Sequence, residues 1–475
     1  SIGFFDFASG TTARAFAFVE AEEADDGTSL TCLNTTDNGT AVASTTSGCT
    51  AANAQVRMTN AVSKIFNLRN QGSLYVIQDN VPTRARQLLA GELGDAVLRL
   101  ELRADDEAIE VTRLMFTNSG ATFVLNNINR LKLYRDGEST SFADATSDAC
   151  NSVNNGTDIP SNSFCAIMES QQLIVQEGDR VDVLVKPQLN NDEAGALAST
   201  TGSLRLFLHK VTDAGKAGTA NDTTGTGSVT ARGFESSNVL LVNDADSTQE
   251  GEVFIGTATA AADAIILGNR NDAVLAKIVG VEDVNKDADG TNVPNGISQT
   301  LAKFKFTAAT NTNTKGFRNS ATLSGLIFSL NTTNVTFDAS EFDLYNVNDQ
   351  QQQISCTAYD SAGVSINSSA LGSGSMLVDC QRGNNTNVDL EMDSGDTITL
   401  VLEGDINDPQ VGAGGSAVTV SINDFSDITD TSYGVTSGES HVRWTDSLNE
   451  STVKVFDWIE YGDTIISSTS YSISG

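Results

Sequence analysis

One acidic loop has the residue spacing of a calcium site. In the stretch EDVNKDADGTN (282–292), Asp283, Asn285, Asp287 and Asp289 stand at alternate positions before a glycine. Calcium prefers several oxygen ligands at short range, and alternate carboxylates and amides in a tight loop supply them. The loop departs from the EF-hand pattern, because its twelfth position lacks the glutamate and no helices are expected at its flanks. The sequence leaves two interpretations, a loop-type calcium site and a solvated acidic turn.

Residues for enzymatic chemistry are scarce. The chain has two histidines, His209 and His441, and they lie in different parts of the predicted repeats. No G-x-S-x-G turn, P-loop or nucleotide-binding glycine motif accompanies them, and a histidine-based zinc site would need more of them. Paired carboxylates for glycoside hydrolysis have no specificity among 61 acidic residues. We therefore expect no enzymatic activity, and no cofactor other than calcium.

Six cysteines fall into three pairs that are close in sequence, and each pair brackets a polar segment rich in Ser, Thr, Asn or Gly. No C-x-x-C motif or neighbouring histidine indicates zinc. Six cysteines allow fifteen connectivities, and the local spacing favours one of them, with disulfides formed in an oxidising compartment. Six buried free thiols are the alternative. The predicted disulfides are Cys32–Cys49, Cys150–Cys165 and Cys356–Cys380.

Glycosylation acceptors of the type N-x-S/T are frequent, but a chain so rich in Asn, Ser and Thr contains many by chance. Their placement is more informative than their number, since several lie inside the cysteine-bracketed loops. Glycans remain candidate partners on these loops. The candidate residues are Asn34, Asn38, Asn155 and Asn367.

The charge balance excludes several classes of partner. Against 61 acidic residues stand 28 basic ones, which gives a net charge of −33. Nucleic acid and anionic membranes would be repelled, whereas a secreted protein in divalent cations would tolerate this charge. No run of apolar residues is long enough for a transmembrane helix. Because the chain starts at Ser1 without signal-peptide architecture, we expect a mature secreted protein.

Short runs of alternating apolar and polar residues recur along the chain. In VLRLELRA (97–104), leucines alternate with charged residues, as in a strand with one face in a core and the other in water. Turn residues separate such runs at intervals typical of sandwiches rather than of β-α-β units. The predicted fold class is all-β, with tandem Ig-like β-sandwich domains and an extended N-terminal strand segment. Further runs lie at 180–189, 203–211, 397–406, 416–425 and 468–475.

The chain also repeats itself in order. The separation between matching segments grows along the chain, which predicts a second copy with loop insertions. We predict residues 1–71 to be a Phe-rich assembly strand plus a disulfide-closed loop, 72–248 the first sandwich and 249–475 the second. The matching segments are 72–76 with 251–255, 88–102 with 265–279, 111–116 with 323–328, 131–136 with 342–347, and 175–192 with 391–408.

Three motifs carry a family resemblance. They are ADDEAIEVTRLMF (104–116), LYRDG (133–137) and RWTDSLNESTVKVFDWIEYGD (443–463). They resemble surface-layer-type proteins of candidate phyla radiation bacteria and of some archaea, whose strand-rich modules carry such signatures and a Trp-Thr/Ser-Asp element near the end. The resemblance covers about residues 72–475 and implies extracellular structural work in a layer, coat or fibre.

The first 19 residues are rich in phenylalanine, and an exposed apolar strand of this kind must be covered to avoid aggregation. Three interpretations compete: a strand donated to a neighbouring subunit, a strand inserted into its own sandwich, and a helix or membrane contact. The alternation of Phe5 with Phe7 and of Phe16 with Phe18 favours a strand. The residues expected to make the assembly contact are Phe4, Phe5, Phe7, Phe16 and Phe18.

Together these observations predict a secreted or cell-surface structural protein that self-assembles into a filament or surface layer. Residues 1–19 would cross the contact between subunits in a head-to-tail arrangement, which gives an open polymer when the rotation does not close. The alternative is a secreted adhesin that binds glycans. That alternative is weakened by the presence of only two Trp, both near the end of the chain.

Overall fold

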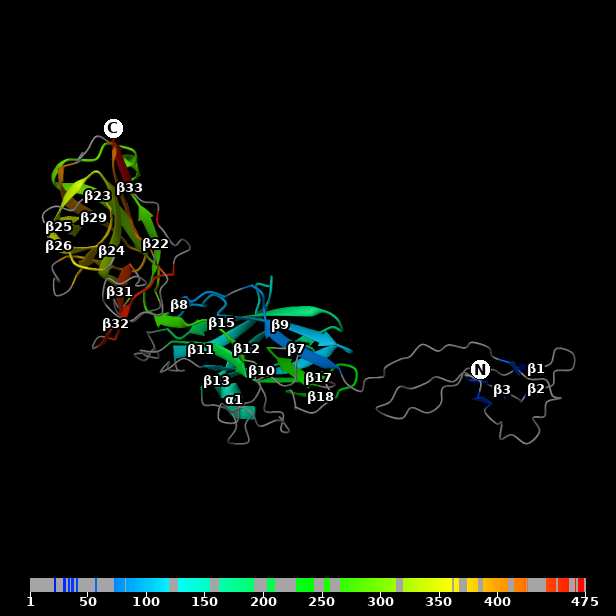
Figure 1. Ribbon diagram of the computed structural model, residues 1–475. Coiled ribbons are helices and arrows are strands. Elements are labelled where there is room, and N and C mark those ends of the chain that lie inside the picture. Colours follow the sequence, from blue (N-terminus) through cyan, green and yellow to red (C-terminus); the bar gives the residue numbers. More distant parts are fainter. Residues whose placement is uncertain are drawn as a thin grey trace. The chain divides into compact units, whose positions relative to one another are not determined.

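The computed structural model (Figure 1) describes two separate units, residues 1–70 and 71–475. In the first unit only short paired strands are described: Ala21–Glu22 (β1) with Ser29–Leu30 (β2), Leu33–Asn34 (β3) with Val56–Arg57 (β6), and Thr36–Asp37 (β4) with Thr40–Ala41 (β5). In the second unit the described residues are 72–81, 83–118, 127–153, 162–191, 203–209, 228–242, 252–256, 265–312, 319–360, 363–366, 374–382, 388–408, 414–423, 425, 441–449, 452–460, 466 and 469–473.

Several predictions fall outside these ranges and stay predictions. They concern the five N-terminal phenylalanines, the pair Cys32–Cys49, and the acceptors Asn38, Asn155 and Asn367. Of Asn34 only the backbone is described, in β3. None of the helices that the structure describes has the length and apolar character needed to cross a bilayer.

The first sandwich is built mainly from antiparallel strands, with one short helix. Its inward-facing residues alternate along each strand; Leu98, Leu100 and Leu102, for example, are all fully buried, as the period of two requires. The elements are β7 (Ser73–Gln78), β8 (Arg86–Leu89), β9 (Leu98–Asp105), β10 (Ile109–Asn118), β11 (Ile128–Arg135), β12 (Ala143–Thr146), α1 (Ser147–Val153), β13 (Ser163–Ile167), β14 (Ile174–Val175), β15 (Arg180–Leu189), β16 (Leu206–His209), β17 (Val229–Gly233), β18 (Val239–Val242), β19 (Glu252–Ile255), β20 (Ile265–Leu267) and β21 (Asn271–Val274).

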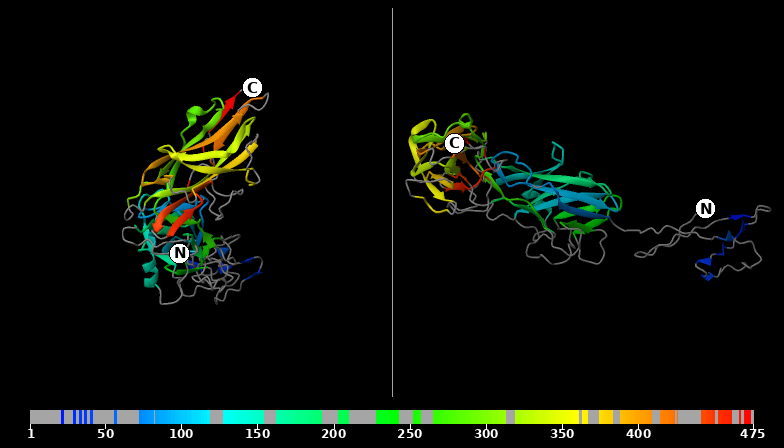
Figure 2. Two further views of the ribbon diagram at one scale, coloured as in Figure 1. Left: turned by 90° about the vertical axis from the view of Figure 1, so that its left-hand side faces the viewer. Right: turned by 45° about the horizontal axis from the view of Figure 1, so that its top comes forward.

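The second sandwich is also all-β, and its strands stay together as one body in both views of Figure 2. A 3₁₀ turn over Lys286–Ala288 is the only helical element described in it. Its strands are β22 (Ile278–Asp283), β23 (Gly296–Ala308), β24 (Ala321–Thr333), β25 (Thr336–Asn346), β26 (Asp349–Asp360), β27 (Gly374–Gln381), β28 (Glu391–Met392), β29 (Thr397–Asp408), β30 (Ser416–Ser421), β31 (Val442–Asn449), β32 (Thr452–Phe456) and β33 (Thr469–Ile473).

The described strands of the second sandwich repeat those of the first in chain order and in pairing. The path β22–β23–β29–β25–β26–β27–β24 corresponds to β7–β9–β15–β11–β12–β13–β10, and β24 pairs with β28, β30 and β31 as β10 pairs with β14, β16 and β17. The pairs β31–β32 and β30–β33 correspond to β17–β18 and β16–β20. Both central strands even shift register at the same place, between Val111 and Arg113 and between Leu323 and Gly325.

This correspondence corrects the predicted boundary between the repeats at 248/249. The strands β19 and β20 belong to the sheet of the first sandwich, and Val253, Ile255, Ile266 and Leu275 lie in its core. The second sandwich begins near Ala276, and β22 rather than β19 is the counterpart of β7. The matches of 72–76 with 251–255 and of 88–102 with 265–279 were therefore wrong in structural terms, because similar strand composition does not imply an equivalent place in a sheet. The other three matches fall on corresponding strands.

Apart from β8 and β21, one strand of the first sandwich has no counterpart among the described strands of the second. The strand β19 pairs in parallel with β18 on one side and with β7 on the other, and so closes the sheet into a ring that returns through β17 and β10. Val253 and Ile255 point into the core, and Phe254 stacks on Tyr75 with 5.0 Å between ring centroids.

Two of the three predicted disulfides are confirmed. Cys150 in α1 is bonded to Cys165 in β13, and Cys356 in β26 is bonded to Cys380 in β27. Each bond joins two consecutive elements, and β13 and β27 hold corresponding places in the two sheets. Disulfides of this kind are typical of proteins that fold in an oxidising compartment.

Candidate functional site: the joint between the two sandwiches

A small parallel sheet forms a wall between the two cores. It consists of β8 and β21, with Gln87 opposite Asp272 and Leu88 opposite Ala273. Because side chains alternate along a strand, Leu88 and Ala273 pack into the first core, whereas the next residues, Leu89 and Val274, pack into the second. The wall is thus shared, and neither core is complete without it.

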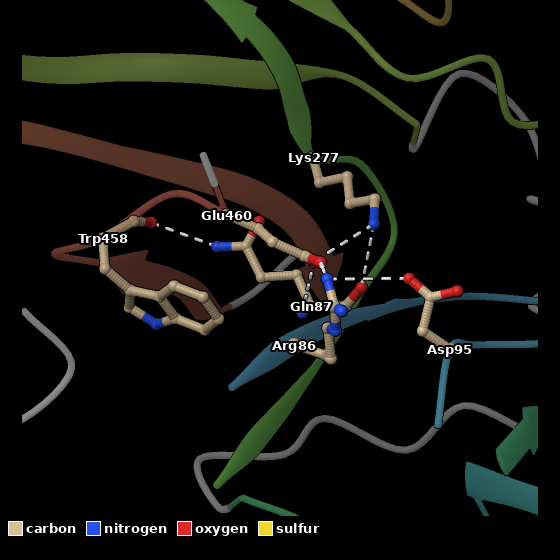
Figure 3. A network of polar contacts seen from close by, with 6 residues as sticks. All are labelled: Arg86, Gln87, Asp95, Lys277, Trp458 and Glu460. Carbon is tan, nitrogen blue, oxygen red and sulfur yellow. Dashed lines mark hydrogen bonds and ion pairs between the residues drawn. The ribbon is translucent and has the colours of Figure 1, made fainter. Parts of the chain in front are cut away.

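Polar contacts surround this wall on the side of the second sandwich (Figure 3). The Nε2 of Gln87 donates a hydrogen bond to the Trp458 carbonyl (3.0 Å), and its backbone N–H donates to Oε2 of Glu460 (3.2 Å). The Nζ of Lys277 donates to the Gln87 carbonyl (3.2 Å) and lies 3.4 Å from the same Glu460 oxygen. Arg86 pairs with Glu460 on its other side. Gln87 is therefore held by both sandwiches at once.

Two tryptophans anchor the far side of the joint. Trp444 is fully buried and stacks on Phe456 with 4.4 Å between ring centroids. Its Nε1 donates to the Trp458 carbonyl (2.8 Å), and the Nε1 of Trp458 donates to Oδ2 of Asp272 in the wall (3.2 Å). Buried indole N–H groups need partners, and here the partners fix the connection between β32 and the wall.

The chain itself crosses the joint at Leu275. Its backbone N–H donates to Oδ2 of Asp446 in β31 (2.9 Å), and its carbonyl accepts from Nδ2 of Asn311 (2.8 Å). Both partners are buried, with Asp446 2% exposed and Asn311 1% exposed. A buried backbone group without such a partner would be costly, so the crossing point is fixed rather than a free linker.

The joint also sets the charge state of its carboxylate. Burial alone would raise the pKa of Glu460, but the charge of Lys277 and the hydrogen bonds from Arg86 and Gln87 outweigh burial and hold the pKa below its usual value. Glu460 is thus a carboxylate at neutral pH and attracts the two cations beside it. The six residues drawn in Figure 3 include no hydroxyl, thiol or imidazole, and the arrangement can fix two bodies to one another.

The predicted calcium loop has a structural role in the second sandwich. The carboxylate of Asp283 accepts from the Asn285 N–H (2.9 Å) and from Thr469 Oγ1 (3.1 Å), and Asp289 accepts from the Ser470 N–H (2.6 Å). Asp287 is exposed. Burial raises the pKa of Asp283, with a contribution from the nearby Asp289. The loop thus holds β33 in place.

Among the residues that the structure describes, no three His, Cys, Asp or Glu side chains converge as metal ligands would. The calcium site therefore stays a prediction. The two histidines lie apart, His209 in β16 of the first sandwich and His441 directly before β31 of the second. Burial, with Arg443 nearby, lowers the pKa of His441 to about 4.

The sequence contained a partial signal for the joint. Trp444, Asp446, Trp458 and Glu460 all lie in the stretch 443–463 that carries the family resemblance, and Asp272 opens the repeated Asp-Ala-Val-Leu. Neither signal indicated that the two stretches touch. The contacts join residues 171 to 186 positions apart, which no local pattern reveals.

No protein-family model matches the sequence, and no curated protein matches it. Among solved structures the chain is similar to the C-terminal domain of the Streptococcus agalactiae AgI/II polypeptide BspA (8% identity, covering 74% of this chain and 94% of that chain, TM-score 0.17). It is also similar to the C-terminal domain of the Streptococcus pyogenes antigen I/II-family protein AspA (10% identity, covering 75% of this chain and 95% of that chain, TM-score 0.16). A third similar structure is the CupB6 tip adhesin from Pseudomonas aeruginosa (10% identity, covering 73% of this chain and 94% of that chain, TM-score 0.18). TM-scores this low carry no argument about function.

Proposed function

We propose that the chain is a non-enzymatic structural protein of the cell exterior, which assembles with copies of itself into a filament or surface layer by passing residues 1–19 to a neighbouring subunit. The two disulfides and the net charge of −33 support an extracellular location. The fixed joint supports a structural role, because it makes the two sandwiches one mechanical unit.

The proposal rests on the segment that connects the two sandwiches, because this segment forms strands in the sheet of the first sandwich. That segment does not run free to the second sandwich. It places β19 between β18 and β7 and lays β20 against β16. Its residues Val253, Ile255 and Ile266 are at most 4% exposed. A segment that precedes one sandwich thus completes the sheet of the sandwich before it.

Residues 3–19 have the same pattern as that segment. GFFDFASGTTARAFAFV (3–19) aligns without a gap with GEVFIGTATAAADAIIL (251–267). Phe5 and Phe7 match Val253 and Ile255, the two core-facing residues of β19, and Phe18 matches Ile266 of β20. The N-terminal segment precedes the first sandwich as 251–267 precedes the second. By this correspondence it would complete the sheet of a sandwich before it, and in our proposal a neighbouring molecule provides that sandwich.

A pair of substitutions tests the proposal with a matched control. Phe5→Asp with Phe7→Asp places carboxylates where β19 has core residues, whereas Phe4 matches Glu252, so Phe4→Asp introduces a charge where the connecting segment already has one. We expect electron microscopy in calcium-containing buffer to show ordered assemblies of the full chain and of F4D, and none of F5D/F7D.

Equal assembly by F5D/F7D and F4D would overturn the strand-donation mechanism. Monodisperse particles from the unaltered chain would overturn self-assembly itself, and the glycan-binding adhesin would then become the leading hypothesis. A melting temperature of F5D/F7D equal to that of the unaltered chain serves as the check that the sandwiches remain folded.

A further inference from the structure

The second sandwich carries a counterpart of the wall, described as one parallel bridge with exposed residues beside it. In the first sandwich the wall pairs Arg86 with Asn271 in parallel, and Asn271 also bridges to Leu204 just before β16. In the second, Thr291 bridges in parallel to Tyr471, and Tyr471 pairs with Val418 in β30. The backbone contacts agree, since Gly290 N–H donates to the Ser470 carbonyl (2.7 Å) and Ser472 N–H donates to the Thr291 carbonyl (2.8 Å).

The residues of the two walls correspond one to one, counted from these bridges. Val293 takes the place of Leu88 and is buried in its own core (4% exposed, against 1% for Leu88). Ile473 takes the place of Ala273 and likewise packs against its own core. The inward face of the wall thus has the same apolar character in both sandwiches of this chain.

The outward faces differ in what covers them. Gln87 and Asp272 are each 2% exposed, because the second sandwich lies on them. Their counterparts Asn292 and Ser472 are exposed. Ile297, the second residue of β23, is 77% exposed. We call Asn292, Pro294, Ile297 and Ser472 the tail surface.

The first sandwich has a surface of the kind that covers the wall. In the second sandwich Asp446 pairs across β24 with Ala321 and accepts the N–H of the incoming chain at Leu275. In the first, Gly233 holds the equivalent place opposite Ile109, and the Glu107 carboxylate accepts the N–H of the incoming Gly72 (2.9 Å).

The carboxylate of Glu107 fills the space beside Gly233. A Cβ at Gly233 would collide with Oγ of Ser236 and with the carboxylate of Glu107, so a larger residue there would require both side chains to shift. Beside it, Phe234 is 40% exposed and Val239 57% exposed. We call Glu107, Phe234 and Val239 the head surface.

We propose that the tail surface of one molecule docks on the head surface of a second copy, and so repeats between molecules the joint that the chain makes within itself. The occupant is a second copy because, within the chain, the wall is covered by a sandwich whose described strand pairings all recur in the first sandwich. Such a heterologous contact propagates rather than closes. The proposal rests on the self-assembly proposed above and names its surfaces.

Introduction of positive charge on each proposed surface is the first arm of the test. Asn292→Arg with Ser472→Arg changes two exposed residues, and Val239→Arg changes the head surface. Val364→Arg is the matched control, because Val364 is 61% exposed but lies between β26 and β27. We expect N292R/S472R and V239R each to lose assemblies in electron micrographs, and V364R to retain them, with all melting temperatures unchanged.

Cross-linking between two preparations is the second arm. Within the chain Gln87 touches Trp458, and their counterparts are Asn292 and Val242, since Leu240 pairs with Ala231 as Phe456 pairs with Trp444. A short bis-maleimide should join N292C of one preparation to V242C of another, and should not join V364C to V242C.

The outcomes separate the two proposals. If F5D/F7D abolishes assembly but N292R/S472R does not, strand donation holds and the docking of tail on head is overturned. Equal cross-linking from positions 292 and 364 overturns it as well. If the unaltered chain forms no assemblies, both proposals fail together.

Discussion

Every strand pairing described in the second sandwich also occurs in the first. The outward residues of the wall, however, are buried in the first sandwich and exposed in the second. Gln87 and Asp272 in the first wall are buried under the second sandwich, whereas Asn292 and Ser472 in the second wall face solvent. The difference lies in what covers each wall rather than in the fold, because the second sandwich lies on the first wall. The same module thus presents in its second copy the surface that the joint buries in its first copy.

The head ends show the complementary difference. The head of the second sandwich contributes Trp444, Trp458 and Glu460 to the joint. Its Asp446 accepts a hydrogen bond from the backbone N–H of Leu275. In the first sandwich Ala231 stands where Trp444 stands, since both pair with the corresponding residue of the central strand. The covered head is aromatic and charged, and the uncovered head is smaller and carries exposed Phe234 and Val239. Substitutions that exchange these features test the comparison.

The largest effect is expected from Trp444→Ala, which gives the second sandwich the residue of the first. Trp444 is fully buried and stacked on Phe456, so truncation leaves a cavity and should cost about 3–5 kcal/mol of unfolding free energy. Urea unfolding followed by fluorescence of the remaining Trp458 measures it. Val455→Ala, at a position 41% exposed, is the control, and equal losses from both would mean that the stack does not support the second core.

A smaller effect is expected from pH, through His441 in the second sandwich. Because burial lowers the pKa of His441 from 6.5 to about 4, the folded state resists its protonation. The stability that neutral His441 contributes is fully present above pH 6.5 and is lost as the pH falls toward 4, by up to about 3 kcal/mol.

Both tryptophans lie in the second sandwich, so their fluorescence reports this loss directly. His441→Gln should flatten the dependence of unfolding free energy on pH between 6.5 and 4. Val364→Ala, at an exposed position without a titratable group, should leave the slope as it is. An unchanged slope in H441Q would show that another group controls acid sensitivity.

Glu460→Gln should weaken the joint by about 1–2 kcal/mol, because it leaves Arg86 and Lys277 without their shared carboxylate. We expect calorimetry to show one unfolding transition for the unaltered unit and two separated transitions for E460Q. Glu391→Gln, at an exposed position in β28, should keep the single transition. If E460Q also keeps it, the apolar wall alone couples the sandwiches.

The smallest expected effect is that of calcium on the loop beside the tail surface. Calcium at about ten times its dissociation constant would add about 1.4 kcal/mol, a rise in melting temperature of a few degrees for a sandwich of this size. Asp287→Asn should remove the rise without disturbing the hydrogen bonds of Asp283 and Asp289. A melting temperature equal in calcium and in chelator would contradict a calcium site.

Local patterns predicted the strands but not their neighbours. The predicted run 180–189 coincides with β15, and the run 97–104 matches β9 to within one position. These strands were predictable because apolar and polar residues alternate within the sequence of each strand. The disulfides of Cys150 and Cys356 were likewise predictable from short spacing. These features depend on residues close in sequence.

The joint could not be predicted in the same way. The identical Asp-Ala-Val-Leu segments at 95–98 and 272–275 suggested equivalence, yet the first leads into β9 and the second forms the wall. What distinguishes them is contact with Trp458, 186 positions from Asp272. The same limit applied to β19, whose composition resembles that of β7 because the two strands are neighbours in one sheet, and not because they begin two repeats.

The most direct test of the account is hydrogen–deuterium exchange on the unassembled and assembled protein. Amides of β8 and β21 should be protected in both states, because the joint within the chain covers them. Amides of residues 289–293 and 469–473 should gain protection on assembly, as a second head surface covers the second wall. If these amides exchange at the same rate in both states, while the protein assembles, copies do not meet through the repeated wall and the central comparison fails.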